Sequence, residues 1–300
     1  MIPVGIFSGY FPYDLNTVID RVKSLGFSTV QLDLSFKDID FSPGKVTRQN
    51  CHVVRDAFRR ANLPICAISG YTNITHPDRE ERGRRVGALK EIIRNARDLG
   101  TPYVISETGT FNTESDWVHH ERNKTEEGYQ EALDVIAELA QEAYDHGAVF
   151  LVENYVNNVI GSAPELLRLF ADLPHPGLGL LMDPTNYFDG TNIDDVDATL
   201  NTMFDALGDR IKIAHAKDCK RAVDTSEKHV EIEGPEANTF RGAGAVELPA
   251  AGLGVLNYDL YVKRLARLHP NIPLIIEHLD EDDVPRAKKF VDDILLKAGA

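Results

Sequence analysis

Short apolar runs that alternate with helical stretches are the feature that most constrains the fold of this chain. Where the first helix is expected, Asp14 precedes the apolar positions and Gly26 follows them, as is typical of a helix start and stop. This alternation is typical of βαβ units that share a parallel sheet. Eight such units favour an α/β fold of the (β/α)₈ TIM barrel type, with a doubly wound open sheet as the alternative. The eight expected strands are 3–8, 28–33, 64–69, 102–107, 148–153, 178–183, 211–216 and 273–278.

The chain shows no internal boundary. No low-complexity segment and no linker rich in Pro, Gly or Ser divides its 300 residues, so we expect 1–300 to form a single domain. The segment 219–257, between the seventh strand and the last full helix, is too long for an ordinary connection. We expect this long loop after the seventh strand to act as a lid.

Composition excludes several classes of partner. The chain carries 47 acidic and 32 basic residues, a formal charge of −15, whereas nucleic-acid binders present basic surface. No apolar run reaches the roughly 18 residues of a membrane span. The three cysteines lack CxxC spacing, which indicates neither a disulfide framework nor a cysteine zinc site. We therefore expect a cytoplasmic protein with no nucleic-acid or membrane partner.

Four consecutive expected strands, the fifth to the eighth, end on potential metal ligands. They are Glu153, Asp183, His215 and Glu277, and the first two intervals, 30 and 32 residues, each correspond to one βα unit. Because the carboxyl ends of barrel strands meet at one mouth, these side chains are expected to converge. Each alone could be a helix cap, an ion-pair partner or a core histidine. Together they predict one site.

Such a cluster needs a cation. Three carboxylates and an imidazole cannot stay close together in the ionised state without a compensating positive charge. Oxygen-rich ligation with one nitrogen favours a single divalent Mn²⁺ ion, with Mg²⁺ or Co²⁺ as alternatives, whereas tetrahedral zinc usually takes more nitrogen or sulfur. The sequence predicts a manganese-type site.

The motifs around these residues resemble a known family, the xylose-isomerase-like TIM barrels that include sugar phosphate isomerases and epimerases. The resemblance rests on "LVENY", "LMDPTN", "HAKD", "PLIIEH" and "AAGLGVLNY", and it covers nearly the whole chain in order. In the ketose 3-epimerases of this family the equivalents of the four residues bind one divalent ion. The resemblance also implies that Arg221, six residues after His215, holds the substrate. It further implies a homodimer or homotetramer.

Two departures leave the reaction open. Ketose 3-epimerases carry a His three residues after the aspartate and a Glu six residues after the first glutamate, where this chain has Asn186 and Val159. Asn186 can hydrogen-bond a sugar hydroxyl but cannot transfer protons. The family assignment does not depend on these positions, but the reaction does.

The expected function is that of a metal-dependent isomerase or epimerase of carbohydrate metabolism, acting on a small keto-sugar through an enediolate. Glu153 and Glu277 would be the catalytic pair, since they approach the metal from opposite sides. If the enediolate expels a β-hydroxyl or glycosyl group, the protein is instead a lyase, a dehydratase or β-eliminase on a 3-keto-sugar, keto-inositol or keto-glycoside. More distant alternatives are an abasic-site endonuclease and a non-catalytic barrel. The acidic net charge makes the endonuclease less favoured.

Further residues at the same mouth are candidates for substrate binding. For Glu107 a helix cap or structural ion pair is the alternative, for His76 a turn-stabilising role, and for Lys217 an ion pair inside the barrel. Trp117, the only tryptophan, lies in the fourth loop, where an aromatic ring could pack on a sugar or anchor the loop. The full set is Arg221, Asn186, Glu107, Lys217, His76 and Trp117.

Overall fold

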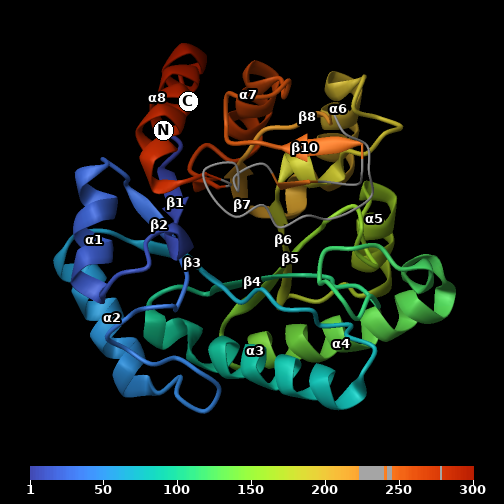
Figure 1. Cartoon of the computed structure of the whole chain (residues 1–300), viewed down its shortest axis with the longest axis horizontal. Helices are drawn as coiled ribbons and strands as arrows, with labels where there is room; N and C mark the ends of the chain where they lie inside the picture. The colour runs from blue at the N-terminus through green and yellow to red at the C-terminus, as the bar shows by residue number, and fades with distance from the viewer. Residues whose placement is uncertain (223–239, 242–244, 278) are drawn as a thin grey trace.

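Eight parallel strands in the described part of the chain close into a barrel. The computed structural model describes residues 1–222, 240–241, 245–277 and 279–300. The strands follow one another around the barrel in the order β1-β11-β7-β6-β5-β4-β3-β2 (Figure 1). The expected (β/α)₈ barrel is confirmed, and the open sheet is not. The strands are β1 (Val4–Phe7), β2 (Thr29–Leu32), β3 (Ile65–Ser69), β4 (Tyr103–Glu107), β5 (Val149–Glu153), β6 (Leu178–Met182), β7 (Ile211–Ala216) and β11 (Leu274–Ile276).

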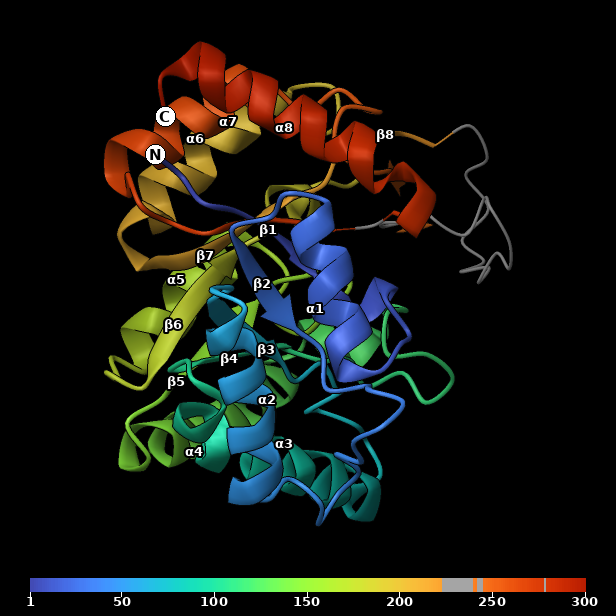
Figure 2. The ribbon, with the colours of Figure 1, turned by 90° about the vertical axis from the view of Figure 1, so that its left-hand side faces the viewer.

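Helices surround the barrel, as Figure 2 shows from the side. Local signals set their ends: the Asp14 side chain accepts a hydrogen bond from Thr17 N, and Gly100 closes α3 with a φ of 99°. The α-helices are α1 (Leu15–Ser24), α2 (Arg48–Arg60), α3 (Arg79–Leu99), α4 (Glu126–Asp145), α5 (Ala163–Asp172), α6 (Val196–Leu207), α7 (Tyr258–Leu268) and α8 (Val284–Ala298). Short 3₁₀ helices are η1 (Ser8–Tyr10), η2 (Glu121–Lys124), η3 (Pro184–Tyr187), η4 (Gly208–Arg210) and η5 (Glu281–Asp283).

The strands are apolar on both faces because both faces are buried. One set of side chains packs inside the barrel and a larger set packs between the barrel and the helices. Helix α5, for example, buries Leu166 and Leu169 against the barrel. The inner set is Ala67, Ile105, Leu151, Leu181, Ile213 and Ile275.

The long segment after β7 contains strands that the sequence did not predict. Its described residues include β8 (Lys220–Arg221), β9 (Phe240–Arg241) and β10 (Val246–Leu248), which form an antiparallel sheet in the order β8-β10-β9. We expected this segment to be a long loop, and these three short strands were not predicted. Residues 223–239 and 242–244 of this segment lie outside the described residues, and the lid stays a prediction.

No helix among the described residues combines the length and the apolar character that crossing a membrane requires.

Candidate metal centre and substrate cavity

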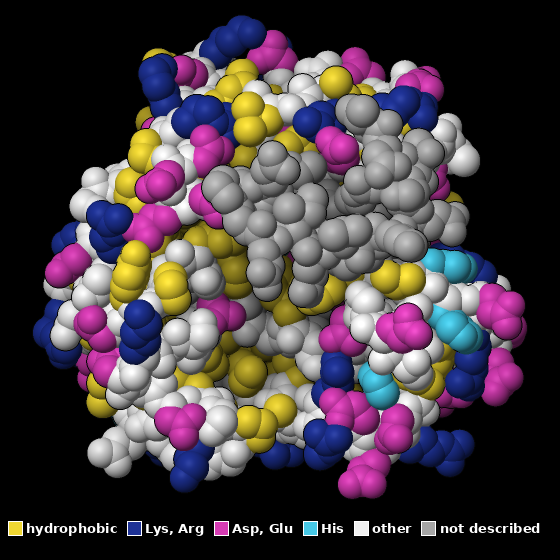
Figure 3. Space-filling model, viewed as in Figure 1, with side chains coloured by type: hydrophobic (Ala, Val, Ile, Leu, Met, Phe, Trp, Pro, Cys, Tyr) yellow, Lys and Arg dark blue, Asp and Glu magenta, His cyan; other side chains and the backbone are white. Residues whose placement is uncertain are grey.

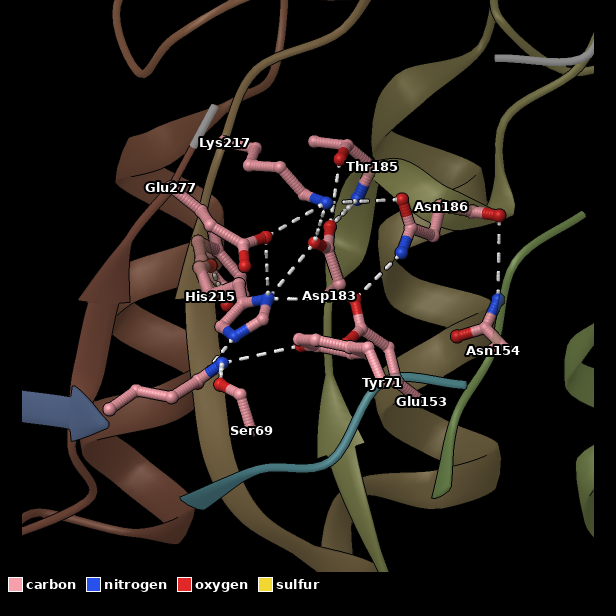
Figure 4. A network of polar contacts seen from close by, with 12 residues as sticks. Ser69, Tyr71, Glu153, Asn154, Asp183, Thr185, Asn186, His215, Lys217 and Glu277 are labelled. Atoms are coloured by element: carbon pink, nitrogen blue, oxygen red, sulfur yellow. Dashed lines mark hydrogen bonds and ion pairs between the residues drawn. The ribbon is translucent and has the colours of Figure 1, made fainter. Parts of the chain in front are cut away.

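The structure brings the four predicted ligands together at one end of the barrel. Glu153 is the last residue of β5, Asp183 follows β6, His215 lies near the end of β7 and Glu277 follows β11. These strands are neighbours in the barrel, so their carboxyl ends point into the same space. One potential ligand atom from each residue lies within 4.8 Å of the others, and all four side chains are buried (Figure 4).

A hydrogen bond on the far side of the ring orients His215. Its Nδ1 lies 3.2 Å from Asp183 Oδ2 and 3.4 Å from Glu277 Oε2, while its Nε2 lies 2.8 Å from Gln31 Oε1. Gln31 Nε2 donates to Ser69 Oγ, so the amide oxygen of Gln31 faces the imidazole. Because that oxygen can only accept, Nε2 of His215 must be the donor. In the neutral ring the lone pair of Nδ1 therefore points toward the carboxylates, as a metal ligand requires.

Lys217 supplies positive charge to the same cluster. Its Nζ lies 2.6 Å from Asp183 Oδ2 and 3.2 Å from Glu277 Oε2, and only 3% of the side chain is exposed. Burial alone would lower the pKa of Lys217, but the charges of Asp183 and Glu277 raise it well above its usual value. Lys217 thus forms the ion pair inside the barrel that was the alternative to substrate binding, and it also lines the cavity.

The buried charges also shift the pKa values of two candidate ligands. Burial would lower the pKa of His215, but the charges of Glu277 and Glu153 outweigh it and raise the pKa to about 10. Burial would raise the pKa of Asp183, but the charge of Lys217 and the hydrogen bond with His215 hold it below its usual value. A divalent ion would replace the imidazolium proton as counter-charge. Three carboxylates and one correctly oriented imidazole fit a hard divalent cation.

The two glutamates differ in their surroundings. Tyr71 OH donates to Glu153 Oε2 at 2.6 Å, and Asn186 Nδ2 donates to Glu153 Oε1 at 2.8 Å. Among the described residues, Glu277 is contacted by His215 and Lys217, and both contacts involve its Oε2 atom. Glu153 is therefore held at both oxygens. Figure 4 shows Asn186 lying between Glu153 and Lys217.

A cavity of about 330 Å³ lies beside this cluster, a size within the range of small-molecule sites. Four of the predicted substrate-binding residues line it, namely Glu107, Trp117, Asn186 and Lys217. Burial and the charge of Glu153 raise the pKa of Glu107 well above its usual value. Aromatic rings form much of the wall, and the space-filling view shows a hollow with hydrophobic side chains on this face (Figure 3). Glu153 and Glu277 line the cavity as well.

Two predicted residues are not among those that line this cavity. The His76 ring accepts a hydrogen bond from Asp78 N at the start of α3, which is a turn-stabilising contact. Arg221 lies on β8, and its guanidinium pairs with Asp194 at 2.5 Å. The structure therefore gives neither residue a contact with the candidate substrate site.

Sequence reasoning missed two residues that contact the cluster. Gln31 is a buried polar residue inside an apolar strand, a signal similar to that of Glu153, and it could have been found. Tyr71 follows β3 by two residues, and nothing in "SGYTN" distinguishes it from an ordinary loop tyrosine. Tyr10 and Tyr155, which also line the cavity, were missed for the same reason.

The fold and the site together define a (β/α)₈ barrel with four potential metal ligands at the carboxyl ends of neighbouring strands. The chain belongs to the xylose isomerase-like TIM barrel family, whose sequence model matches residues 19–296. No curated protein matches the chain by sequence.

Solved structures show the same fold at low sequence identity. A xylose isomerase domain protein from Planctomyces limnophilus is 20% identical, with a TM-score of 0.72 over 99% of this chain and 98% of that one. A D-tagatose 3-epimerase-like protein is 15% identical, with a TM-score of 0.71 over 99% and 98%. The probable 3-DHS dehydratase AsbF from Bacillus anthracis is 14% identical, with a TM-score of 0.68 over 99% of each chain. Other structures of this fold hold magnesium or zinc.

Proposed function

We propose that this protein is a divalent-metal-dependent sugar isomerase or epimerase that acts on a small keto-sugar through an enediolate. The observation that carries the proposal is the convergence of four ligand atoms within 4.8 Å beside a cavity of sugar size. Glu153, Asp183, His215 and Glu277 would hold the ion, with Mn²⁺ preferred and Mg²⁺ or Co²⁺ as alternatives. When bound, the ion supplies positive charge that polarises the substrate carbonyl and acidifies the neighbouring C–H group.

Two carboxylates can exchange the substrate proton. Glu153 on β5 and Glu277 after β11 are separated in the barrel by β6 and β7, so they reach the cavity from two sides. One takes the proton from carbon and the other returns a proton to the opposite face, which inverts that carbon. If one glutamate moves the proton between adjacent carbons, the result is aldose–ketose isomerisation.

Neighbouring side chains position these groups. Asn186 holds Glu153 Oε1 and, as an amide, can hydrogen-bond a sugar hydroxyl without exchanging protons with it. Lys217, which also lines the cavity, can donate to a substrate oxygen. Trp117 and Tyr10 lie where aromatic rings can cover the substrate and exclude water from the enediolate. Binding of the substrate at these residues is part of the proposal.

One observation favours the lyase alternative. Glu107 lines the cavity, and burial together with the charge of Glu153 raises the pKa of its carboxyl group well above the usual value, which favours the protonated form. A neutral carboxyl group can protonate a departing hydroxyl or glycosyl oxygen. Proton removal by Glu153 or Glu277 followed by this step would give elimination from a 3-keto-sugar, keto-inositol or keto-glycoside. The relative named as a probable dehydratase makes this the second candidate.

An exchange experiment tests the shared first step. The Mn²⁺-loaded protein is incubated in D₂O with 3-keto-sugars, and NMR follows the C–H signals next to the carbonyl. We expect deuterium incorporation, which Glu153→Gln and Glu277→Gln each slow by at least about a hundredfold. An isomer without ultraviolet absorbance then identifies epimerisation, and an absorbing unsaturated product identifies elimination. Undiminished exchange in both variants would exclude the proposed pair.

The setting of this activity is also part of the proposal. We propose a cytoplasmic enzyme of carbohydrate metabolism that works as a homodimer or homotetramer. The cysteines of the chain are free in the described structure, which is compatible with a reducing compartment.

A further inference from the structure

A second, larger space adjoins the candidate substrate cavity. Tyr71 and Thr72 line both the cavity and an adjoining groove of about 830 Å³. The groove lies between the segment 33–43, which follows β2, and the middle of α3. Tyr71 also donates to Glu153, so the wall that the two spaces share is in direct contact with the candidate metal centre.

The groove offers apolar contact surface. Phe36, Phe41 and Ile92 line it, and each is only partly buried by the rest of the protein. The rings of Phe36 and Phe41 lie 6.2 Å apart at an interplanar angle of 55°. Large side chains left partly open in this way gain contact area when a flat apolar group lies on them.

The charges around the groove cancel. Three basic and three acidic residues line it, so it has no formal net charge for an ionic ligand. Arg85 is already paired with Asp116 at 2.6 Å and with Glu81 at 2.7 Å. Arg84 also pairs with Glu81, and Lys37 Nζ lies 5.5 Å from the centre of the Tyr13 ring. A phosphate or carboxylate group would therefore meet no excess of positive charge here, whereas a neutral group would not need one. The charged lining residues are Lys37, Arg84, Arg85, Asp33, Asp38 and Asp40.

We propose that the groove is a subsite for the neutral aromatic aglycone of a keto-glycoside whose sugar ring occupies the cavity beside Glu153 and Glu277. The sugar part of this inference rests on the proposed function. The aglycone part rests on the groove alone: its shared wall with the cavity, its open aromatic floor and its balanced charge. The substrate class is therefore a glycoside rather than a free monosaccharide.

Binding to the Mn²⁺-loaded protein tests the subsite without any chemistry. Titration calorimetry compares 4-nitrophenyl glucosides with methyl glucosides of the same anomer. We expect the aryl glucoside of one anomer to bind about tenfold more tightly than its methyl counterpart. Equal affinities for both pairs would overturn the proposal. A methyl cellobioside that binds as tightly as the aryl glucoside would assign the groove to a second sugar and would also overturn it.

A pair of variants on one helix locates the effect. Ala88 lines the groove on α3, and Ala88→Trp should fill it and abolish the aryl preference. The neighbouring Gly87 is exposed, and no neighbouring atom lies within 4 Å of the point that a Cβ would occupy there, so Gly87→Trp serves as the matched control and should keep the preference. Ile92→Asn, checked for folding by circular dichroism, replaces Ala88→Trp if that variant does not fold. Equal preferences in groove and control variants would contradict the proposal.

The exchange reaction separates this inference from the proposed function. Deuterium exchange into a free 3-keto-sugar should persist in Ala88→Trp, because the substituted residue does not line the cavity. Exchange without an aryl preference would support the proposed function and contradict the aglycone subsite. An aryl preference that depends on the groove, without exchange, would support the aglycone subsite and contradict the proposed function.

Discussion

The charge of the candidate metal centre depends on the protonation of His215. With His215 and Lys217 both cationic, two positive charges face the three carboxylates, which leaves one net negative charge. Gln31 fixes Nε2 as a donor, so the proton that ionises the ring sits on Nδ1, between the carboxylates. A metal ion and this proton would compete for the same lone pair.

Metal binding should therefore release a proton. Because the pKa of His215 is raised to about 10, the ring is protonated throughout the neutral range and must lose its proton to become a ligand. The apparent affinity for Mn²⁺ should rise about tenfold per pH unit between pH 6 and 8 and stop rising from this cause above about pH 10. Calorimetry in buffers of different ionisation enthalpy should count about one proton released per ion at pH 7.

Two histidine variants check the assignment. His215→Gln should abolish both the release and most of the affinity, whereas His175→Gln, at a partly exposed histidine before β6, should change neither. Binding with no buffer dependence in the unaltered protein would show that His215 is not a ligand.

At the scale of residues, the sequence predicts ligands better than their supporting partners. Glu153 stands out because its charge ends an apolar strand, and barrel geometry then brings it to the other strand ends. Tyr71, which follows β3, contacts Glu153 on β5 although β4 lies between these two strands. This contact depends on where the closed barrel places the loop after β3. Arg221 shows the reverse case, since the family resemblance implies a substrate contact but the side chain pairs with Asp194.

At the scale of elements, one carboxylate ties β7 to the turn before α7. Asp218 accepts hydrogen bonds from the backbone N–H groups of Cys219, Gly252 and Leu256, at 2.9 to 3.0 Å. Gly252 adopts a φ of 86°, which favours glycine, and a side chain on Gly254 would clash with Asp218. This explains the glycines of "AAGLGVLNY" as requirements of a turn that is built around the Asp218 carboxylate.

Removing that carboxylate should destabilise the protein. Asp218→Ala leaves three backbone donors without their partner, and at about 1 kcal/mol per bond the free energy of unfolding should fall by roughly 3 kcal/mol. Urea denaturation followed by circular dichroism measures it. Asp209→Ala, at an exposed position in η4, is the matched control and should stay within about 0.5 kcal/mol of the unaltered protein. Equal midpoints for the two variants would contradict this role of Asp218.

The barrel strands are predictable from sequence because each is a short, largely apolar run, and the helices between them carry clear start and stop signals. The strands β8, β9 and β10 have two, two and three residues, too few to establish an alternating pattern. Their existence depends on pairing between residues far apart in the chain, such as Arg221 with Val246. Such pairing becomes visible only in the folded structure.

At the scale of the whole molecule, the candidate metal site brings together residues from the middle and from the last part of the chain. Glu277 follows β11, which pairs with β1 and closes the ring, while Glu153 lies on β5 near the middle of the chain. Unfolding separates the four ligands, because they are far apart in sequence. An ion that binds all four in the folded state therefore stabilises the entire barrel rather than one loop.

Loading and removing the ion should change the melting temperature. With Mn²⁺ at a hundred times its dissociation constant, folding gains about 2.7 kcal/mol. At roughly 2–3 °C per kcal/mol for a chain of this size, the loaded protein should melt about 5–8 °C above the chelator-treated protein in differential scanning calorimetry.

The shift should disappear in the Glu153→Gln/Glu277→Gln double variant, because two of the four ligands are then neutral amides. It should persist in Glu114→Gln/Glu121→Gln, which removes the same charge from two exposed positions. If both double variants kept the full shift, the ion would bind elsewhere, and the cluster at the barrel mouth would be a network of ion pairs around Lys217.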